Sequence, residues 1–166
     1  MSRNTLQYWF DRIDERITRF MAGYGMVLLR VSIGIIFLWF GALKLIDGGS
    51  PAEGLIQATV TFISPDWFIP FLAVWEILIG LGFITGLYLR VTIFLLFCQM
   101  PGTFLPIIVR PDLVFTTFPI GLTMEGQYII KNLVVVSAAL VIGATLRYRR
   151  LSKRREQQSV QFPITR

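Results

Sequence analysis

Two charged residues lie inside stretches of the sequence that are otherwise apolar enough to cross a bilayer. Arg30 falls within the apolar run 22–46, and Glu76 lies at the midpoint of a second run, 67–85. Charged side chains within membrane helices almost always face the bundle interior and pair with one another. At 1.5 Å per residue the two differ in depth by roughly 6 Å, which an arginine side chain spans. The sequence therefore predicts a buried Arg30–Glu76 ion pair, which either locks two helices together or binds an anion or quinone headgroup.

Small and aromatic residues accompany Arg30 on one face of the first predicted helix. Spacings of three and four place a stripe within about 80° of one another: Arg30, Gly34, Phe37, Gly41 and Lys44. We expect this stripe to face the other helices, with Gly34 and Gly41 in a polar core. In the second helix, Gly80 and Gly82 would permit close approach of a neighbouring backbone.

A proline interrupts the third apolar run and frees main-chain carbonyl groups. Pro101 removes one intrahelical hydrogen bond and kinks a helix, and the freed carbonyls need partners in protein, water or ligand. Gln99 and Thr103 flank the proline and carry suitable side chains. We therefore add both to the polar core, as ligand-binding or structural residues.

A second polar set is predicted at the outer side of the membrane. Lys44 ends the first span there, and three residues lie in the first turns of the last span: Tyr128, Lys131 and Asn132. Converging on one cavity, these residues would bind a polar headgroup or an anion. Alternatively, both lysines extend to the interface without any binding role.

The absence of common redox ligands argues against catalysis by this chain alone. The sequence contains no histidine and one cysteine, Cys98. Haem and zinc therefore lack their usual ligand, and no internal disulfide or dithiol pair can form. We predict no catalytic residue, no metal site and no firm cofactor beyond a bound quinone or lipid.

Composition places the chain among integral membrane proteins. Its 166 residues are 54% hydrophobic and only 16% charged, whereas soluble domains carry nearer a quarter charged residues. Four spans are predicted, at about 22–46, 67–85, 91–109 and 127–146. The fold class is an all-α, four-transmembrane-helix bundle. An amphipathic interfacial helix, 1–21, precedes it; outer interfacial segments lie between spans; and a basic tail, 147–166, follows.

The distribution of cations predicts the orientation of the bundle. Lys and Arg concentrate before the first span and after the last, so both termini should face the cytoplasm of an inner, or cytoplasmic, membrane. The apolar face of 1–21 would lie on the membrane or dock on a partner subunit. The tail either anchors the last span or attracts anionic lipid.

The glycine and charge pattern resembles the DoxX-like family of small four-span membrane proteins. The residues that carry the resemblance are the stripe from Arg30 to Lys44, Glu76 with Gly80, Gly86 and Arg90, and the Lys131-Asn132 pair. It extends over about 27–146 and looks closest to the RclC/YkgB branch. The resemblance implies a four-span bundle, a link to quinone-dependent oxidoreductases and a role in oxidative or reactive-chlorine stress.

Together these observations predict a non-catalytic accessory subunit of a larger redox or respiratory/photosynthetic-type membrane complex, binding lipid or quinone headgroups in its polar interior. Its partners would be membrane lipids and other membrane subunits, contacted through 1–21 and the lipid-facing helices, and not nucleic acid. Two alternatives stay open. One is a membrane subunit of a quinone-linked oxidoreductase or an oxidative-stress-response protein; the other is a small oligomeric transporter.

Overall fold

The structure, a computed structural model, describes residues 3–46, 48–61 and 63–161, and side chains within 7–146 of these ranges. Four long helices dominate: α1 (Arg3–Leu43), α3 (Pro65–Thr85), α4 (Leu89–Phe104) and α7 (Met124–Gln161). Shorter elements connect them: α2 (Glu53–Thr59), α5 (Pro106–Val109), α6 (Pro111–Val114), and the antiparallel strands β1 (Phe115–Thr117) and β2 (Gly121–Leu122).

Four stretches are long and apolar enough to cross a membrane, which confirms the predicted fold class. They are Gln7–Leu43, Pro65–Thr85, Leu89–Val109 and Met124–Leu146. The last three lie within a few residues of the predicted spans. The third stretch is divided, because α4 ends at Phe104 and Pro106 begins α5.

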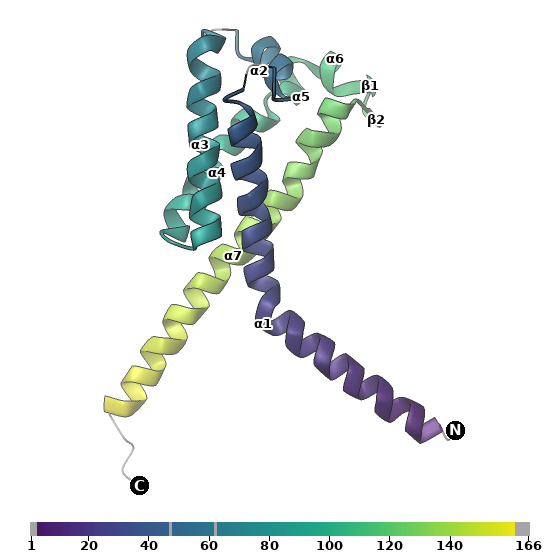
Figure 1. The fold of residues 1–166 in the computed structure, drawn as a ribbon, viewed down its shortest axis with the longest axis vertical. Coiled ribbons are helices and arrows are strands. Elements are labelled where there is room, and N and C mark those ends of the chain that lie inside the picture. Colours follow the sequence, from purple (N-terminus) through teal and green to yellow (C-terminus); the bar gives the residue numbers. More distant parts are fainter. Residues whose placement is uncertain (1–2, 47, 62, 162–166) are drawn as a thin grey trace.

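The short elements gather at one end of the bundle, and both chain ends leave from the other (Figure 1). We call these the hairpin end, formed by α2, α5, α6 and the two strands, and the terminal end. The turn 86–88 joins α3 to α4, so these helices are antiparallel neighbours, as predicted. Helix α1 makes its most extensive contacts with α3, while α7 contacts both α4 and α1.

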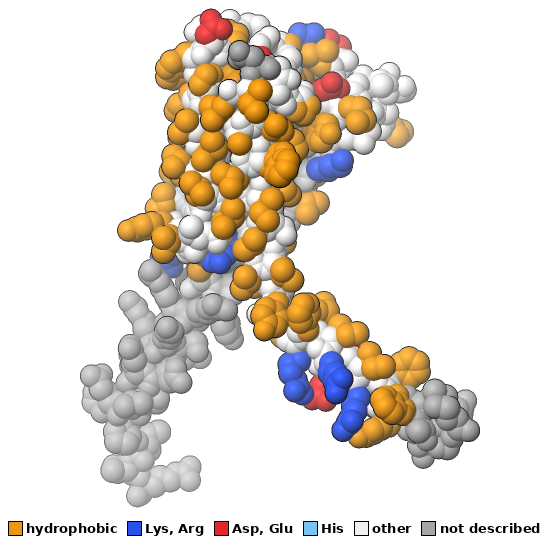
Figure 2. All heavy atoms as spheres, in the orientation of Figure 1, with side chains coloured by type: hydrophobic (Ala, Val, Ile, Leu, Met, Phe, Trp, Pro, Cys, Tyr) orange, Lys and Arg blue, Asp and Glu red, His pale blue; other side chains and the backbone are white. Residues whose placement is uncertain are grey.

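The predicted amphipathic segment 1–21 and the first span belong to one helix, α1. No proline separates them, and Gly23 and Gly25 weaken a helix without ending it. Figure 1 shows α1 bending, so that its first part forms an arm directed away from the bundle. Apolar side chains cover one side of this arm and most cations the other (Figure 2). Glu15 and Arg19 form an i, i+4 ion pair of 2.6 Å on it.

The predicted basic tail is not a separate segment either, because α7 continues as helix through Gln161. The side chains of 1–6 and 147–166, and the backbone of 1–2 and 162–166, lie outside the described part of the chain.

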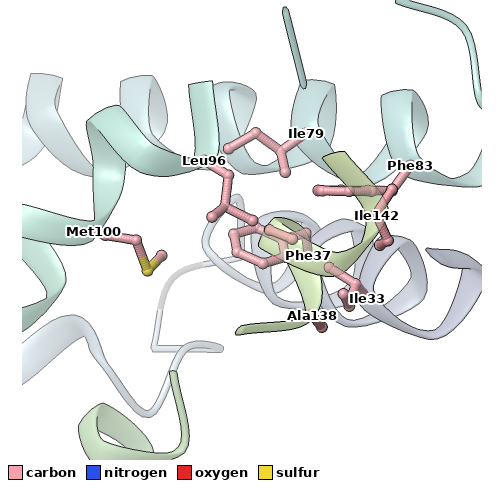
Figure 3. Packing of buried hydrophobic residues seen from close by; sticks show 9 residues of the cluster. Ile33, Phe37, Ile79, Phe83, Leu96, Met100, Ala138 and Ile142 are labelled. Carbon is pink, nitrogen blue, oxygen red and sulfur yellow. The ribbon is translucent and has the colours of Figure 1, made fainter. Parts of the chain in front are cut away.

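All four spans contribute to one buried core (Figure 3). Its members are Ile33 and Phe37 from α1, Ile79 and Phe83 from α3, Leu96 and Met100 from α4, and Ala138, Ala139 and Ile142 from α7. The Arg30–Lys44 stripe faces this interior as predicted, since Gly34, Phe37, Gly41 and Lys44 are buried and Arg30 is half-buried.

Glycines set the distance between α1 and α3. A Cβ atom placed on Gly80 would lie 2.5 Å from the amide nitrogen of Leu38, and one on Gly34 would lie 2.8 Å from the carbonyl oxygen of Gly80. A Cβ on Gly41 would lie 2.9 Å from the carbonyl oxygen of Ala73. Because these neighbours are backbone atoms, no side chain can move aside. The predicted close approach of a neighbouring backbone is confirmed at Gly80, and it fixes the register of α1 against α3. It is wrong at Gly82, where an added Cβ would meet the side chain of Thr92 in α4.

We expect Gly80→Ala to lower the free energy of unfolding by about 1–3 kcal/mol, because the added methyl forces two backbones apart. Gly102→Ala in α4 is the matched control, since a Cβ there meets no atom within 4 Å. The control should be neutral or stabilising by up to about 1 kcal/mol, through helix propensity. Equilibrium unfolding in detergent micelles measures both changes. Equal effects of the two substitutions would contradict the close crossing.

Candidate buried polar site

Three polar side chains from three helices meet inside the bundle. Lys44 follows the last residue of α1, Glu76 lies on α3 and Gln99 on α4. The Nζ of Lys44 donates to Oε2 of Glu76 at 2.6 Å, and the Nε2 of Gln99 donates to Oε1 of the same carboxylate at 2.7 Å. We call this set the Lys–Glu–Gln triad. It accounts for both carboxylate oxygens and links α1, α3 and α4.

The charged members of the triad are removed from solvent. The side chains of Lys44 and Glu76 are only 5% and 9% exposed. A lone charge in such surroundings is strongly destabilising, whereas a paired and hydrogen-bonded one is tolerated. Lys44 also donates to the carbonyl oxygen of Phe40 at 3.5 Å, at the end of α1 where unpaired carbonyls accumulate. The lysine therefore caps α1 as well as pairing with Glu76.

The predicted Arg30–Glu76 pair is wrong, and helix geometry explains why. Gly34 lies against Gly80 and Gly41 against Ala73, so Glu76 is level with about residue 38 of α1. Arg30 and Lys44 lie roughly 12 Å and 9 Å from that level at 1.5 Å per residue.

The direction of the side chains then decides the partner of Glu76. Cα–Cβ bonds tilt toward the N-terminus of their helix. In the antiparallel helices α1 and α3, this tilt separates Arg30 from Glu76 and brings Lys44 toward it.

Arg30 instead lies against the turn that ends α3. A Cβ on Gly86 would collide with Nη1 of Arg30, and Gly86 has a φ of +75°. Glycine is therefore required there both for space and for backbone conformation. The Nε of Arg30 is buried and has no hydrogen-bond partner among the described residues.

The side-chain oxygen of Gln99 is not used in the triad. The carboxylate of Glu76 only accepts hydrogen bonds, so the amide nitrogen of Gln99 must face it. This orientation directs Oε1 of Gln99 elsewhere, where it is buried without a partner among the described residues. The triad thus contains an acceptor that a donor group could satisfy.

Thr103 supports the backbone of α4 and does not join the triad. Its hydroxyl donates to the carbonyl oxygen of Gln99 at 3.4 Å. Pro101 lies between them, inside the helix. The prediction that Thr103 satisfies a carbonyl freed by the proline is wrong. Pro101 frees the carbonyl of the residue four positions before it, Phe97, whereas Thr103 bonds the carbonyl of Gln99.

The predicted outer cluster is not assembled. Lys44 is buried with Glu76, whereas Lys131 and Tyr128 are exposed on α7. The Lys131 ammonium lies over the Tyr128 ring, 5.3 Å from its centroid, and Asn132 donates to the carbonyl oxygen of Tyr128 at 3.0 Å. These three residues interact along one helix face, and the expected meeting with Lys44 is wrong. Among the described residues no group of acidic, cysteine or histidine side chains could hold a metal ion.

A polar clamp at the hairpin end was missed by sequence reasoning. The Arg110 guanidinium donates to both carboxylate oxygens of Asp112, at 3.0 and 2.7 Å, and to the carbonyl oxygen of Ala58 in α2 at 3.4 Å. Arg110 thereby ties α2 to the α5–α6 segment. The Arg110-Pro-Asp112 spacing was a signal for the ion pair, but no sequence feature pointed to Ala58, 52 residues away.

We predict that Lys44 and Glu76 are energetically coupled. Lys44→Met or Glu76→Gln alone should lower the free energy of unfolding by about 3–5 kcal/mol, because each leaves a buried group unpaired. The Lys44→Met/Glu76→Leu double variant should lose much less free energy of unfolding than the losses of Lys44→Met alone and Glu76→Leu alone added together. In the control cycle, Arg30→Gln and Glu76→Gln should add within about 0.5 kcal/mol. Unfolding in micelles provides the data, and additivity for Lys44 with coupling for Arg30 would refute the assignment.

The clamp predicts a small acid sensitivity. The hydrogen bonds from Arg110 lower the pKa of Asp112. A depressed folded-state pKa stabilises the fold fully above the unfolded value, about 4, and this stabilisation disappears as pH falls through the folded-state pKa. The difference in melting temperature between the wild type and Asp112→Asn should therefore shrink between pH 6 and pH 3. A difference in melting temperature that stays constant over this pH range would show that the Arg110–Asp112 pair does not contribute to the pH dependence of stability.

Comparison with known proteins identifies the part of the chain that holds this site. A protein-family model described as DoxX matches residues 25–109, more than half of the chain. This segment contains all three members of the triad, and also Arg30 and Gly86. No curated protein and no solved structure matches the sequence. The RclC/YkgB branch stays a prediction, whereas the family is established. With its four membrane-spanning stretches, this chain belongs to the DoxX family.

Proposed function

We propose that this DoxX-family chain is a non-catalytic accessory subunit of a larger redox or respiratory membrane complex, and that its triad binds a quinone or lipid headgroup. The observation that carries the proposal is the buried Oε1 of Gln99, which has no partner among the described residues and lies beside a buried ion pair. A buried acceptor without a donor is destabilising. A ligand that supplies the donor would remove this penalty.

The triad offers complementary groups to such a headgroup. Lys44 has three N–H donors, and its bonds to Glu76 and Phe40 use two of them. One ammonium proton and the Gln99 oxygen are thus left to a ligand. A headgroup with one acceptor and one donor matches this pair. A reduced quinone (a quinol) and a hydroxylated lipid have both, whereas an oxidised quinone has acceptors only and would satisfy Lys44 but not Gln99.

The surface of α4 beside Gln99 is open toward the membrane. Gln99 is half-buried, whereas Pro101 and Gly102 in the same helix are exposed. A Cβ on Gly102 would meet no atom within 4 Å. A membrane-dissolved ligand could therefore approach from this side without leaving the bilayer.

An accessory role follows from what the chain supplies. The sequence has no histidine and one cysteine, so the triad can bind and orient a headgroup while electron transfer is left to a partner. Exposed apolar residues on the arm, among them Trp9, Phe10 and Ile13, are available to lipid or to another subunit. Cations on the arm and at the terminal end favour cytoplasmic termini in an inner membrane.

The test is ligand retention by the full-length protein. We expect wild-type protein, purified gently into native-lipid nanodiscs, to retain a quinone or a defined lipid detectable by mass spectrometry. Gln99→Leu should retain about tenfold less, because a hydrogen bond next to charged groups is lost. Thr103→Val is the control, since that hydroxyl bonds only to the backbone among the described residues. Equal retention by Gln99→Leu and wild type would reject the proposed site.

A further inference from the structure

A second polar position lies at the terminal end, far from the triad. Arg30 is half-buried there, with its guanidinium against Gly86, and its buried Nε has no partner among the described residues. None of the hydrogen bonds found among the described side chains uses this guanidinium. A guanidinium carries five N–H donors and stays charged, so Arg30 is a strong anion-binding group that no described side chain pairs with.

No described carboxylate is placed to neutralise Arg30. The three ion pairs among the described residues are Arg19–Glu15, Lys44–Glu76 and Arg110–Asp112. The nearest acidic residue along α1, Glu15, is fifteen positions away, roughly 22 Å of helix. On the face drawn in Figure 2, the terminal end of the bundle shows cations and no acidic side chains.

A second arginine lies just after the turn against which Arg30 packs. Arg90 is exposed in the first turn of α4, four residues after Gly86. A cation at a helix N-terminus adds to the positive end of the helix dipole, which is unfavourable unless an anion is near. Two arginines therefore lie at the turn between α3 and α4, Arg30 from α1 against Gly86 and Arg90 in the first turn of α4, and neither has an anionic partner among the described residues.

The position along the bundle indicates what the anion is. Residues 86–90 lie where two membrane-spanning stretches end, which is the depth of lipid headgroups. Arginine binds phosphate oxygens in a planar, bidentate manner. Gly86 leaves the space beside the turn that this guanidinium occupies.

We propose that Arg30 and Arg90 form a binding site for the phosphodiester of an anionic phospholipid at the α3–α4 turn. The site is separate from the triad, which lies deeper and toward the hairpin end. Arg30, fixed against Gly86, positions the phosphate, and Arg90 supplies the second positive charge from the surface. The bound lipid would neutralise Arg30 and brace the α3–α4 turn against α1.

The test compares three probes on the full-length protein in neutral detergent. Phosphatidylglycerol should raise the melting temperature of the wild type by about 5 °C at saturation. Phosphatidylcholine and inorganic phosphate should raise it far less. An equal shift with inorganic phosphate would overturn the lipid assignment, and an equal shift with phosphatidylcholine would overturn the requirement for net negative charge.

Variants locate the effect. Arg30→Gln and Arg90→Gln should each weaken phosphatidylglycerol binding about tenfold, through loss of charge-assisted hydrogen bonds. Lys131→Gln removes an exposed cation from α7 and should bind like the wild type. If Arg30→Gln does not fold, the exposed Arg90 still carries the test. Wild-type affinity in Arg90→Gln, or equal weakening in Lys131→Gln, would refute the site, whatever Gln99→Leu does to the triad.

Discussion

The ion pair between Lys44 and Glu76 is the interaction on which the polar interior depends. It joins the end of α1 to the middle of α3, and Gln99 extends it to α4. Charges removed from solvent are tolerated only when they are matched. Each of these three helices must therefore lie at a defined depth relative to the other two. The same depths bring together the apolar side chains of the buried core.

The glycine crossing makes this pair possible. The backbones of α1 and α3 touch at Gly34, Gly41 and Gly80. If one helix slid along its axis, larger side chains would collide with the backbone of the other. Apolar packing in a membrane specifies depth weakly, since lipid tails are as apolar as the helices. The small residues at the crossing and the buried Lys44–Glu76 pair specify the relative depth of α1 and α3, which apolar packing alone does not.

Sequence periodicity was sufficient for the spans, for the inward-facing stripe and for the close approach at Gly80, because these depend on local spacing. It assigned Glu76 to Arg30 because depth was counted from span midpoints, without the tilt of side chains toward each helix N-terminus. The glycine register, which puts Glu76 level with about residue 38 of α1, and that tilt together favour Lys44. The expected meeting of Lys44 with Lys131 failed because it depended on the rotation of α7, which tertiary packing sets. The contact of Arg110 with Ala58 had no local signal.

The two ends of the bundle carry different polar groups, the Lys–Glu–Gln triad toward the hairpin end and the cations Arg30 and Arg90 at the terminal end. Solid-state NMR in lipid bilayers can detect the Lys44–Glu76 pair itself, on protein labelled with ¹⁵N at lysine and arginine side chains and ¹³C at Glu carboxylates. We predict strong dipolar coupling between the Lys44 ammonium and the Glu76 carboxyl carbon, absent in Lys44→Met. Coupling of that carbon to the Arg30 guanidinium instead would show that Glu76 pairs with Arg30 and not with Lys44.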